Sequence, residues 1–175
     1  RPMKIAVFCG SGGNKDYLQL GKEVGTFLAG KNIDIVYGGA SIGVMGAVAD
    51  GALQVGGEVI GVIPRFMQKV EIAHQQLSQL IEVDDMHERK KRMYDLSDAF
   101  LILPGGLGTL DEFFEIFTWG QLKLLGPREK PIYLYNFKGF YSELIKHLHK
   151  CVSEGFLQDT QLQRLRTIEK MEELL

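Results

Sequence analysis

One segment of the sequence combines groups that can bind a phosphate with a carboxylate that can take part in catalysis. It runs from Leu103 to Glu112 as LPGGLGTLDE and passes from an apolar run into helical spacing. Free backbone N–H groups at the start of a helix attract an anion together with the helix dipole, and Thr109 adds a hydroxyl group. Asp111 stands where a dinucleotide fingerprint needs its third glycine, and the sequence contains no Gly-Lys-Ser/Thr of a P-loop. We therefore expect a site for a monophosphate.

The carboxylate of Glu112 has two interpretations. It can serve catalysis beside the bound phosphate compound. It can equally stabilise the helix, because Thr109-x-x-Glu112 is also a capping box, in which two side chains satisfy backbone donors at a helix start. The spacing alone leaves both interpretations open.

A second group of charged residues lies on a predicted helix over Met86–Leu96. The apolar residues Met86, Met93 and Leu96 mark the buried side of this helix, and Arg89 fills the gap between them. A guanidinium group that faces inward needs an anion. The anion can be a ligand or a structural carboxylate, and the side chain can also reach solvent along the surface.

The basic residues that follow Arg89 differ in orientation. Lys90 flanks the same buried side of the helix, whereas Lys91 and Arg92 fall on the opposite face. We expect Lys91 and Arg92 to form a solvated run of charge.

The elements that must position these residues follow from hydropathy. Short apolar runs suit strands that are covered on both faces, and they lie at Ile5–Cys9, Ile33–Tyr37, Val59–Ile63, Leu80–Val83, Ala99–Leu103 and Ile132–Tyr135. Segments with helical spacing lie between most of them, at Tyr17–Ala29, Val44–Val55, Met86–Leu96, Leu110–Leu124 and Gly139–Val152. We expect a doubly wound, Rossmann-like parallel α/β sheet with helices on both faces. The polar end from Gln158 is expected to add a short strand near Thr167 and then a helix.

Glycine is the residue type in excess, with 21 among 175 residues. Three glycine turns, at Gly10–Gly13, Gly38–Gly39 and Gly105–Gly108, each follow a predicted strand. A tight turn can need glycine for its own geometry, but three turns at the carboxyl edge of one sheet favour a ligand site.

Length and charge restrict the class of protein. At 175 residues the chain is expected to form a single nucleotide-binding α/β domain over residues 1–175. The formal charge of −2 gives no general attraction to nucleic acid or to an anionic membrane. Cys9 and Cys151 are far apart in the sequence, and no apolar stretch approaches a membrane span, so we expect a cytoplasmic protein without a disulfide framework.

Other candidate residues are weaker. The four histidines show no metal-ligand spacing, so a metal site is not expected. Cys9 ends a predicted core strand and is interpreted as a packed thiol. One helix carries four aromatic residues, Phe113, Phe114, Phe117 and Trp119, which favours core packing or a dimer interface over stacking on a base.

Several motifs together resemble one family. They are Val7-Phe8-Cys9-Gly10-Ser11, Val36-Tyr37-Gly38-Gly39, Gly43-Val44-Met45-Gly46, Gly61-Val62-Ile63-Pro64, Met86-His87-Glu88-Arg89-Lys90, Ser97-Asp98-Ala99-Phe100, PGGxGTxxE from Pro104 to Glu112, and Thr118-Trp119-x-Gln121. Over nearly the whole chain the sequence is similar to the LONELY GUY (LOG) family of cytokinin-activating phosphoribohydrolases, which also carries the misleading label of lysine decarboxylase-like proteins.

The resemblance implies an activity and a set of residues. Enzymes of this family cleave the N-glycosidic bond of cytokinin riboside 5'-monophosphates, and many accept AMP, without a metal or organic cofactor. Arg89 and Glu112 would be the catalytic pair. The nucleotide would contact Glu71, Lys90, Gly106, Leu107, Gly108, Thr109, Leu110, Asp111 and Thr118. The resemblance also implies a homodimer or a dimer-based oligomer.

Departures and alternatives remain at this point. The first glycine loop is shorter than usual, Ala40 replaces a common glycine and Asp111 replaces a common glutamate, which affects the expected substrate preference. A nucleotide-binding or carrier module without catalysis could use the same fold. Decarboxylation with pyridoxal phosphate rests on the label alone, because no lysine is singled out as a Schiff-base former.

Overall fold

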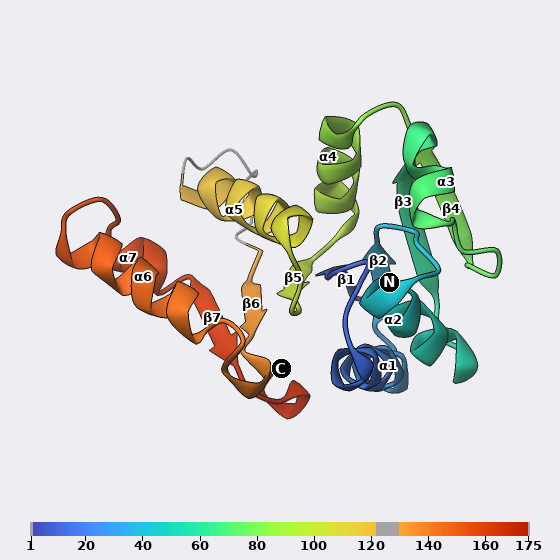
Figure 1. The fold of residues 1–175 in the computed structure, drawn as a ribbon, viewed down its shortest axis with the longest axis horizontal. Helices are drawn as coiled ribbons and strands as arrows, with labels where there is room; N and C mark the ends of the chain where they lie inside the picture. Colours follow the sequence, from blue (N-terminus) through green and yellow to red (C-terminus); the bar gives the residue numbers. More distant parts are fainter. Residues whose placement is uncertain (1, 122–129, 175) are drawn as a thin grey trace.

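The computed structural model describes residues 2–121 and 130–174 and contains one seven-stranded sheet (Figure 1). All neighbouring strands pair in parallel, in the order β4-β3-β2-β1-β5-β6-β7. The strands are β1 Lys4–Phe8, β2 Asp34–Tyr37, β3 Val59–Pro64, β4 Gln79–Val83, β5 Ala99–Ile102, β6 Ile132–Tyr135 and β7 Leu165–Ile168.

The sheet order reverses beside its central strand. From β1 the chain adds β2, β3 and β4 outward on one side, and it then returns to place β5, β6 and β7 on the other side. In the register, Ile5 lies beside Ile35 of β2 and also beside Ala99 of β5. A crevice therefore forms at the carboxyl ends of β1 and β5, where sheets of this kind bind ligands.

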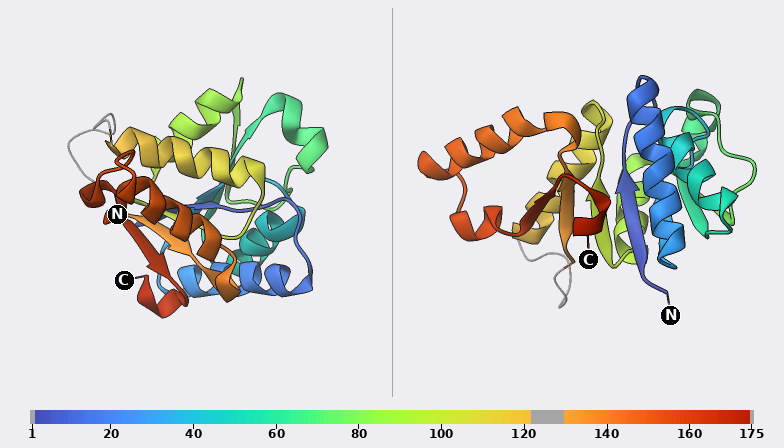
Figure 2. Two further views of the ribbon diagram at one scale, coloured as in Figure 1. Left: turned by 60° about the vertical axis from the view of Figure 1, so that its left-hand side comes forward. Right: turned by 90° about the horizontal axis from the view of Figure 1, so that it is seen from below.

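Helices cover both faces of the sheet. Helices α1 (Lys15–Gly30) and α2 (Gly43–Gln54) pack on one face, and α4 (Met86–Leu96), α5 (Leu107–Gln121) and α6 (Ser142–Ser153) pack on the other, as Figure 2 shows. The short elements are α3 Gln68–Glu71, α7 Asp159–Leu162 and the 3-10 turns η1 Arg65–Met67, η2 Phe137–Gly139 and η3 Met171–Glu173. Among the helices of the described ranges, none is long and apolar enough to cross a membrane.

Glycine allows α1 and α2 to pack in close contact. A Cβ atom on Gly25 would lie 2.1 Å from the carbonyl oxygen of Val48, and one on Gly51 would lie 2.3 Å from the carbonyl oxygen of Lys22. The two backbones approach at these points, and part of the glycine excess is explained by packing away from the strand ends.

The predicted fold class is confirmed, and the differences lie at the boundaries. The six predicted strands and the strand near Thr167 are present, but the expected terminal helix is only the turn Met171–Glu173. Helices α3 and α7 were missed because four residues are too few to show a helical period. Helix α5 begins at Leu107, three residues before the prediction, since glycines hid its first turn. Its predicted end at Leu124 lies outside the described residues.

The aromatic residues of α5 do not all have the same role. Phe113 and Phe117 are buried within this subunit, in the core between the sheet and the helices of its face. Core packing, one of the two expectations for this helix, is confirmed for Phe113 and Phe117, so neither side chain offers a dimer contact. Trp119 is half-buried against Tyr94, whereas Phe114 and Thr118 are exposed.

Candidate active site

A cavity of about 550 Å³ opens at the carboxyl ends of β1 and β5, a size typical of small-molecule sites. Its lining comes from the two glycine loops, from helices of both faces and from the α3 segment. The lining residues are Cys9–Asn14, Tyr17, Val44, Met45, Glu71, Arg89, Pro104–Thr109, Glu112 and Phe140.

The start of α5 forms one wall of the cavity. The first hydrogen bond inside this helix joins the Leu110 N–H to the Gly106 carbonyl at 3.1 Å, so the N–H groups of residues 107–109 have no partner within the helix. Cβ atoms on Gly106 or Gly108 would meet nothing within 4 Å, so these glycines border open space. This wall can bind an anion through backbone N–H groups and the helix dipole.

The same helix start tests the capping-box interpretation of Glu112. Because α5 begins at Leu107, Thr109 lies inside its first turn and is not the N-cap residue. A capping box also needs a hydrogen bond from the Thr109 backbone N–H to the Glu112 side chain, and the described residues show none. The capping-box interpretation is therefore wrong, and the carboxylate of Glu112 lines the cavity instead.

The surroundings of Glu112 favour its neutral form. Burial raises the pKa of the Glu112 carboxyl to about 7, the positive charge of Arg89 partly opposes this rise, and the negative charge of Glu71 adds to it. Near neutral pH this side chain can therefore accept or donate a proton.

Arg89 points inward, as the helical spacing predicted, and is only 2% exposed. Its Nε donates to the Val62 carbonyl at 2.9 Å, and its Nη2 donates to the Gly38 carbonyl at 2.6 Å and to Oε2 of Glu71 at 3.1 Å. A Cβ atom on Gly38 would lie 2.0 Å from Nη2, so the second glycine turn is what admits the guanidinium group. The expected anion is thus a carboxylate of the chain itself, and both partners line the cavity.

Glu71 comes from the short helix α3, where hydropathy gave no signal and only the family resemblance named it. It is 8% exposed. A carboxylate this buried is stable because Arg89 balances its charge.

The remaining residues implied by the resemblance lie outside this cavity in the subunit. Lys90 is buried and bonds to Asp111 at 3.0 Å and also to Glu115, so it joins α4 to α5. Leu110 packs toward the core, and Thr118 is exposed on α5. Contact of Lys90, Leu110, Asp111 and Thr118 with a nucleotide stays a prediction.

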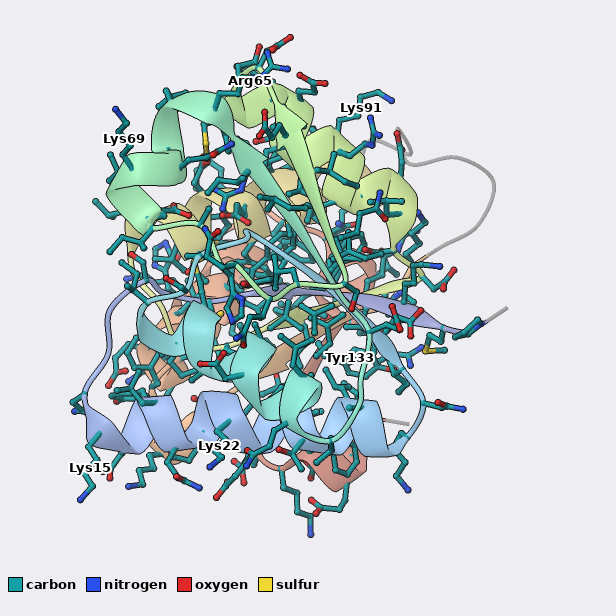
Figure 3. All side chains as sticks on the ribbon, turned by 90° about the vertical axis from the view of Figure 1, so that its right-hand side faces the viewer. Lys15, Lys22, Arg65, Lys69, Lys91 and Tyr133 are labelled. Carbon is teal, nitrogen blue, oxygen red and sulfur yellow. The ribbon has the colours of Figure 1, made fainter. Side chains whose placement is uncertain are left out.

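The solvated charge of α4 lies where its spacing predicted. Lys91 is exposed and forms an ion pair with Asp95 at 2.9 Å, and Figure 3 shows its side chain at the surface. Lys91 therefore has no part in the cavity.

Sequence reasoning did not single out the aromatic wall of the cavity. Tyr17 and Phe140 lie edge to face with ring centroids 5.8 Å apart. Tyr17 follows the first glycine loop closely, which is a usable signal, but Phe140 is more than a hundred residues away and gives none.

Cys9 follows β1 directly, lines the cavity and is buried. Burial raises the pKa of the Cys9 thiol far above its usual range, and the charge of Glu112 raises it further. The thiol stays protonated, in agreement with its interpretation as a packing residue.

Within the described ranges there is no cluster of three or more His, Cys, Asp or Glu side chains suited to a metal ion. His74, which is buried, instead makes a 2.7 Å contact between its Nε2 and Asp50.

Comparison with known sequences gives consistent relatives. The family model described as "Possible lysine decarboxylase" matches residues 45–175. The cytokinin riboside 5'-monophosphate phosphoribohydrolase LOG1 of Arabidopsis thaliana is 46% identical over 159 residues, which cover 90% of this chain and 73% of the relative. The cytokinin riboside 5'-monophosphate phosphoribohydrolase of Rhodococcoides fascians is 43% identical over 89% of this chain and 79% of its own length.

Solved structures share the fold at low identity. The molybdenum cofactor binding protein from Rippkaea orientalis superposes with a TM-score of 0.74 at 21% identity and covers 99% of this chain and 93% of that one. The molybdenum cofactor carrier protein of Chlamydomonas reinhardtii has a TM-score of 0.69, also at 21% identity, over 97% of this chain and 91% of that one. These likenesses concern the fold, whereas the matched family model and the relatives above 40% identity show that the chain belongs to the LOG family.

Proposed function

We propose that this protein hydrolyses the N-glycosidic bond of purine nucleoside 5'-monophosphates, releasing the free base and ribose 5-phosphate. The substrates are cytokinin riboside 5'-monophosphates, AMP or both. One observation carries the proposal: the carboxylate of Glu112 and the free N–H groups at the start of α5 share one cavity. Relatives at 43–46% identity that are named as phosphoribohydrolases support the same reaction.

The chemistry needs a negative group beside the sugar. Cleavage of the bond to the base builds positive charge on the anomeric carbon and its ring oxygen, and an ionised carboxylate there stabilises that charge or activates the attacking water. The 5'-phosphate binds to the N–H groups of residues 107–109, and Thr109 adds its hydroxyl group. The phosphate then holds the ribose near Glu112, which lies one turn farther along the same helix.

Arg89 acts mainly through other side chains. Its Nε and Nη2 already donate to Val62, Gly38 and Glu71. These contacts support a role in fixing Glu71, and the charge of Arg89 lowers the pKa of Glu112 to near neutral pH. They support this role more than direct binding of Arg89 to phosphate. Orientation of the carboxylates is the role of Arg89 that these contacts fit best.

The alternative functions have less support. A function as a carrier without catalysis is suggested only by the molybdenum cofactor proteins, which share the fold with this chain at 21% sequence identity. Similarity at this level concerns the fold alone. Decarboxylation through a Schiff base needs a lysine in the cavity, and none of the described lining residues is a lysine.

Assembly and location complete the proposal. We expect a homodimer that uses the exposed face of α5, where Phe114 is 39% exposed beside Thr118. Cytoplasmic location and a single domain over residues 1–175 stay part of the proposal.

The test is incubation with AMP and with isopentenyladenosine monophosphate, followed by chromatography for the free bases. Adenosine is the matched control because it lacks only the phosphate. We expect kcat/KM for adenosine to be far lower, since binding energy at the phosphate contributes to transition-state stabilisation. Absence of base from either monophosphate would contradict the hydrolase, and equal kcat/KM for AMP and adenosine would contradict the phosphate site.

A further inference from the structure

Residues 71–76 cross the carboxyl end of the sheet, between α3 and β4, and are called the strap below. The strap begins with Glu71, whose carboxylate pairs with Arg89 in the cavity. It is tied to the loop between β2 and α2, because the His74 N–H donates to the Gly39 carbonyl at 2.9 Å and Ala73 forms an isolated antiparallel bridge with Ala40. The contact of His74 with Asp50 ties the strap to α2 as well.

Ile72 has an unfavourable backbone conformation within the strap. Its φ is 53° and its ψ is 87°, in the left-handed region. A β-branched residue rarely adopts this region, because its Cβ substituents crowd the backbone. The side chain of Ile72 is 55% exposed, so burial of that side chain does not explain the conformation.

Ser41 supplies the contacts that hold Ile72 in this conformation. The Ser41 N–H donates to the Ile72 carbonyl at 2.8 Å, and the Ser41 hydroxyl donates to the same carbonyl at 2.6 Å. Two donors on one carbonyl fix the direction of the peptide that follows Ile72. Ser41 itself does not line the cavity.

The left-handed residue ends α3 directly after Glu71 and turns the chain there. As a result Glu71 is buried against Arg89, while its neighbours Val70 and Ile72 face solvent. The loop between β2 and α2 controls both partners of this ion pair, because Gly38 accepts from Arg89 and Ser41 holds the strap.

We propose that Ser41 is a positioning residue for the reaction, which keeps Ile72 left-handed and thereby holds Glu71 against Arg89 beside Glu112. The inference rests on the proposed hydrolase function. Strained residues persist where surrounding contacts hold them, and they cluster at functional sites.

The experiment compares Ser41→Ala with Ser41→Thr and with the double variant Ser41→Ala/Ile72→Gly. Glycine adopts the left-handed region without strain, so it should remove the need for the Ser41 hydroxyl. We expect Ser41→Ala to lower kcat by about 10-fold to 100-fold with a smaller change in KM, because a misplaced catalytic group costs rate. Ser41→Thr, which keeps the hydroxyl, and the double variant should both regain most of the activity.

Asn32 provides the matched control, because it is also left-handed, with φ at 61°, but lies outside the cavity lining. Asn32→Gly should not restore the activity of Ser41→Ala. The proposal is overturned if Ser41→Ala has the kcat of the wild type, if Ile72→Gly fails to restore it, or if Asn32→Gly restores it equally.

A second measurement separates this inference from the proposed function. If the wild type releases no base from either monophosphate, the hydrolase proposal fails, and the link between Ser41 and Ile72 is tested by unfolding without substrate. Ser41→Ala should then lower the unfolding midpoint in the Ile72 protein and have little effect in the Ile72→Gly protein. Equal effects in both would overturn the strap mechanism itself.

Discussion

Glu112 and its neighbours show how a partly buried carboxylate in a cavity can be kept reactive. The carboxylate has lost much of its contact with water, which raises its pKa to about 7, and the nearby charges of Arg89 and Glu71 act in opposite directions. Glu71 has its own cation at 3.1 Å, so the pair at Arg89 leaves Glu112 without a direct ionic partner in the described residues. An unpaired carboxylate in a cavity is costly for folding and useful for chemistry.

The first prediction concerns replacement of Glu112 by glutamine. Glu112→Gln should lower kcat at least about 100-fold, the usual contribution of such a group. Its unfolding midpoint at pH 8 should equal or exceed that of the wild type. The folded-state pKa of Glu112 is raised, so its contribution to stability is full at low pH and is lost as pH rises through about 7. The measurements are initial rates and thermal melts.

The matched control is Glu143→Gln, an exposed glutamate on α6 outside the cavity lining, which should leave both values unchanged. A fully active Glu112→Gln protein would remove Glu112 from catalysis and move the assignment to Glu71, the other carboxylate among the described lining residues.

The second prediction concerns the pH dependence of catalysis. The ionised form of Glu112 is the active one in the proposed reaction, so log kcat/KM for AMP should rise with pH and level off above about 7. Glu112→Gln should lose this acid limb while keeping its residual rate. A rate that falls as pH rises through 7 would indicate that the protonated carboxyl is required instead.

At the scale of elements, one short helix carries both a cavity residue and a solvated charge run. Helix α4 turns Arg89 and Lys90 inward and leaves Lys91 in solvent. Lys90 bonds to Asp111 and Glu115 of α5, so α4 also braces the helix that carries Glu112. Helix periodicity thus decides which of the four adjacent basic residues from Arg89 to Arg92 can reach the site.

The third prediction uses that difference. Arg89→Ala should lower kcat about as much as Glu112→Gln, roughly 100-fold or more, because Glu71 loses its cation and Glu112 loses the charge that favours its ionised form. Lys91→Ala, two residues away, should change kcat less than about 2-fold, since exposed ion pairs contribute little. Comparable losses in the two variants would contradict the assignment of faces on α4.

The fourth prediction concerns the contact between α1 and α2. Gly25→Ala should lower the free energy of unfolding by about 1–3 kcal/mol, because the new methyl group meets the Val48 carbonyl oxygen at 2.1 Å. Gly30→Ala, near the end of the same helix, meets nothing within 4 Å and should stabilise the protein by about 0.4–1 kcal/mol. Chemical denaturation measures both, and a stable Gly25→Ala protein would show that the helices can separate at no cost.

At the scale of the whole molecule, the order of the strands creates the cavity. Because the chain returns to add β5 beside β1, the loop after β1 and the start of α5 meet at one edge although about ninety residues separate them. The same topology brings Arg89, from a helix on one face, to the loop that follows β2 at the carboxyl end of the sheet, where it contacts Gly38. The cavity is therefore a property of the complete sheet.

The fifth prediction concerns assembly. Light scattering at micromolar concentration should give a dimer or a multiple of dimers, because Phe114 leaves apolar surface exposed on α5. Phe114→Glu should shift the population toward the monomer. Phe156, which is exposed on the turn after α6, provides the control, and Phe156→Glu should leave the dimer population unchanged. A wild-type monomer near the chain mass of 19.6 kDa would contradict the dimer.

The sequence by itself determined the elements and several orientations. Short continuous apolar runs and helical spacing are local patterns, so they predicted the parallel sheet, the inward side of α4 with Arg89 and the outward position of Lys91. The glycine turns predicted which edge of the sheet carries the cavity, because glycine marks backbone that must come close to another group.

Only the tertiary structure decided the pairings between distant segments. Local patterns carry no information about the partner of Arg89, which is Glu71 on a helix too short to show a period, or about the partners of Lys90 on α5. The structure also shows that α5 begins at Leu107, so Glu112 is a cavity residue and not part of a capping box. It further shows that Phe113 and Phe117 are core residues. These outcomes depend on packing and on charges brought together by the order of the strands, and that order is fixed by contacts between residues far apart in the chain.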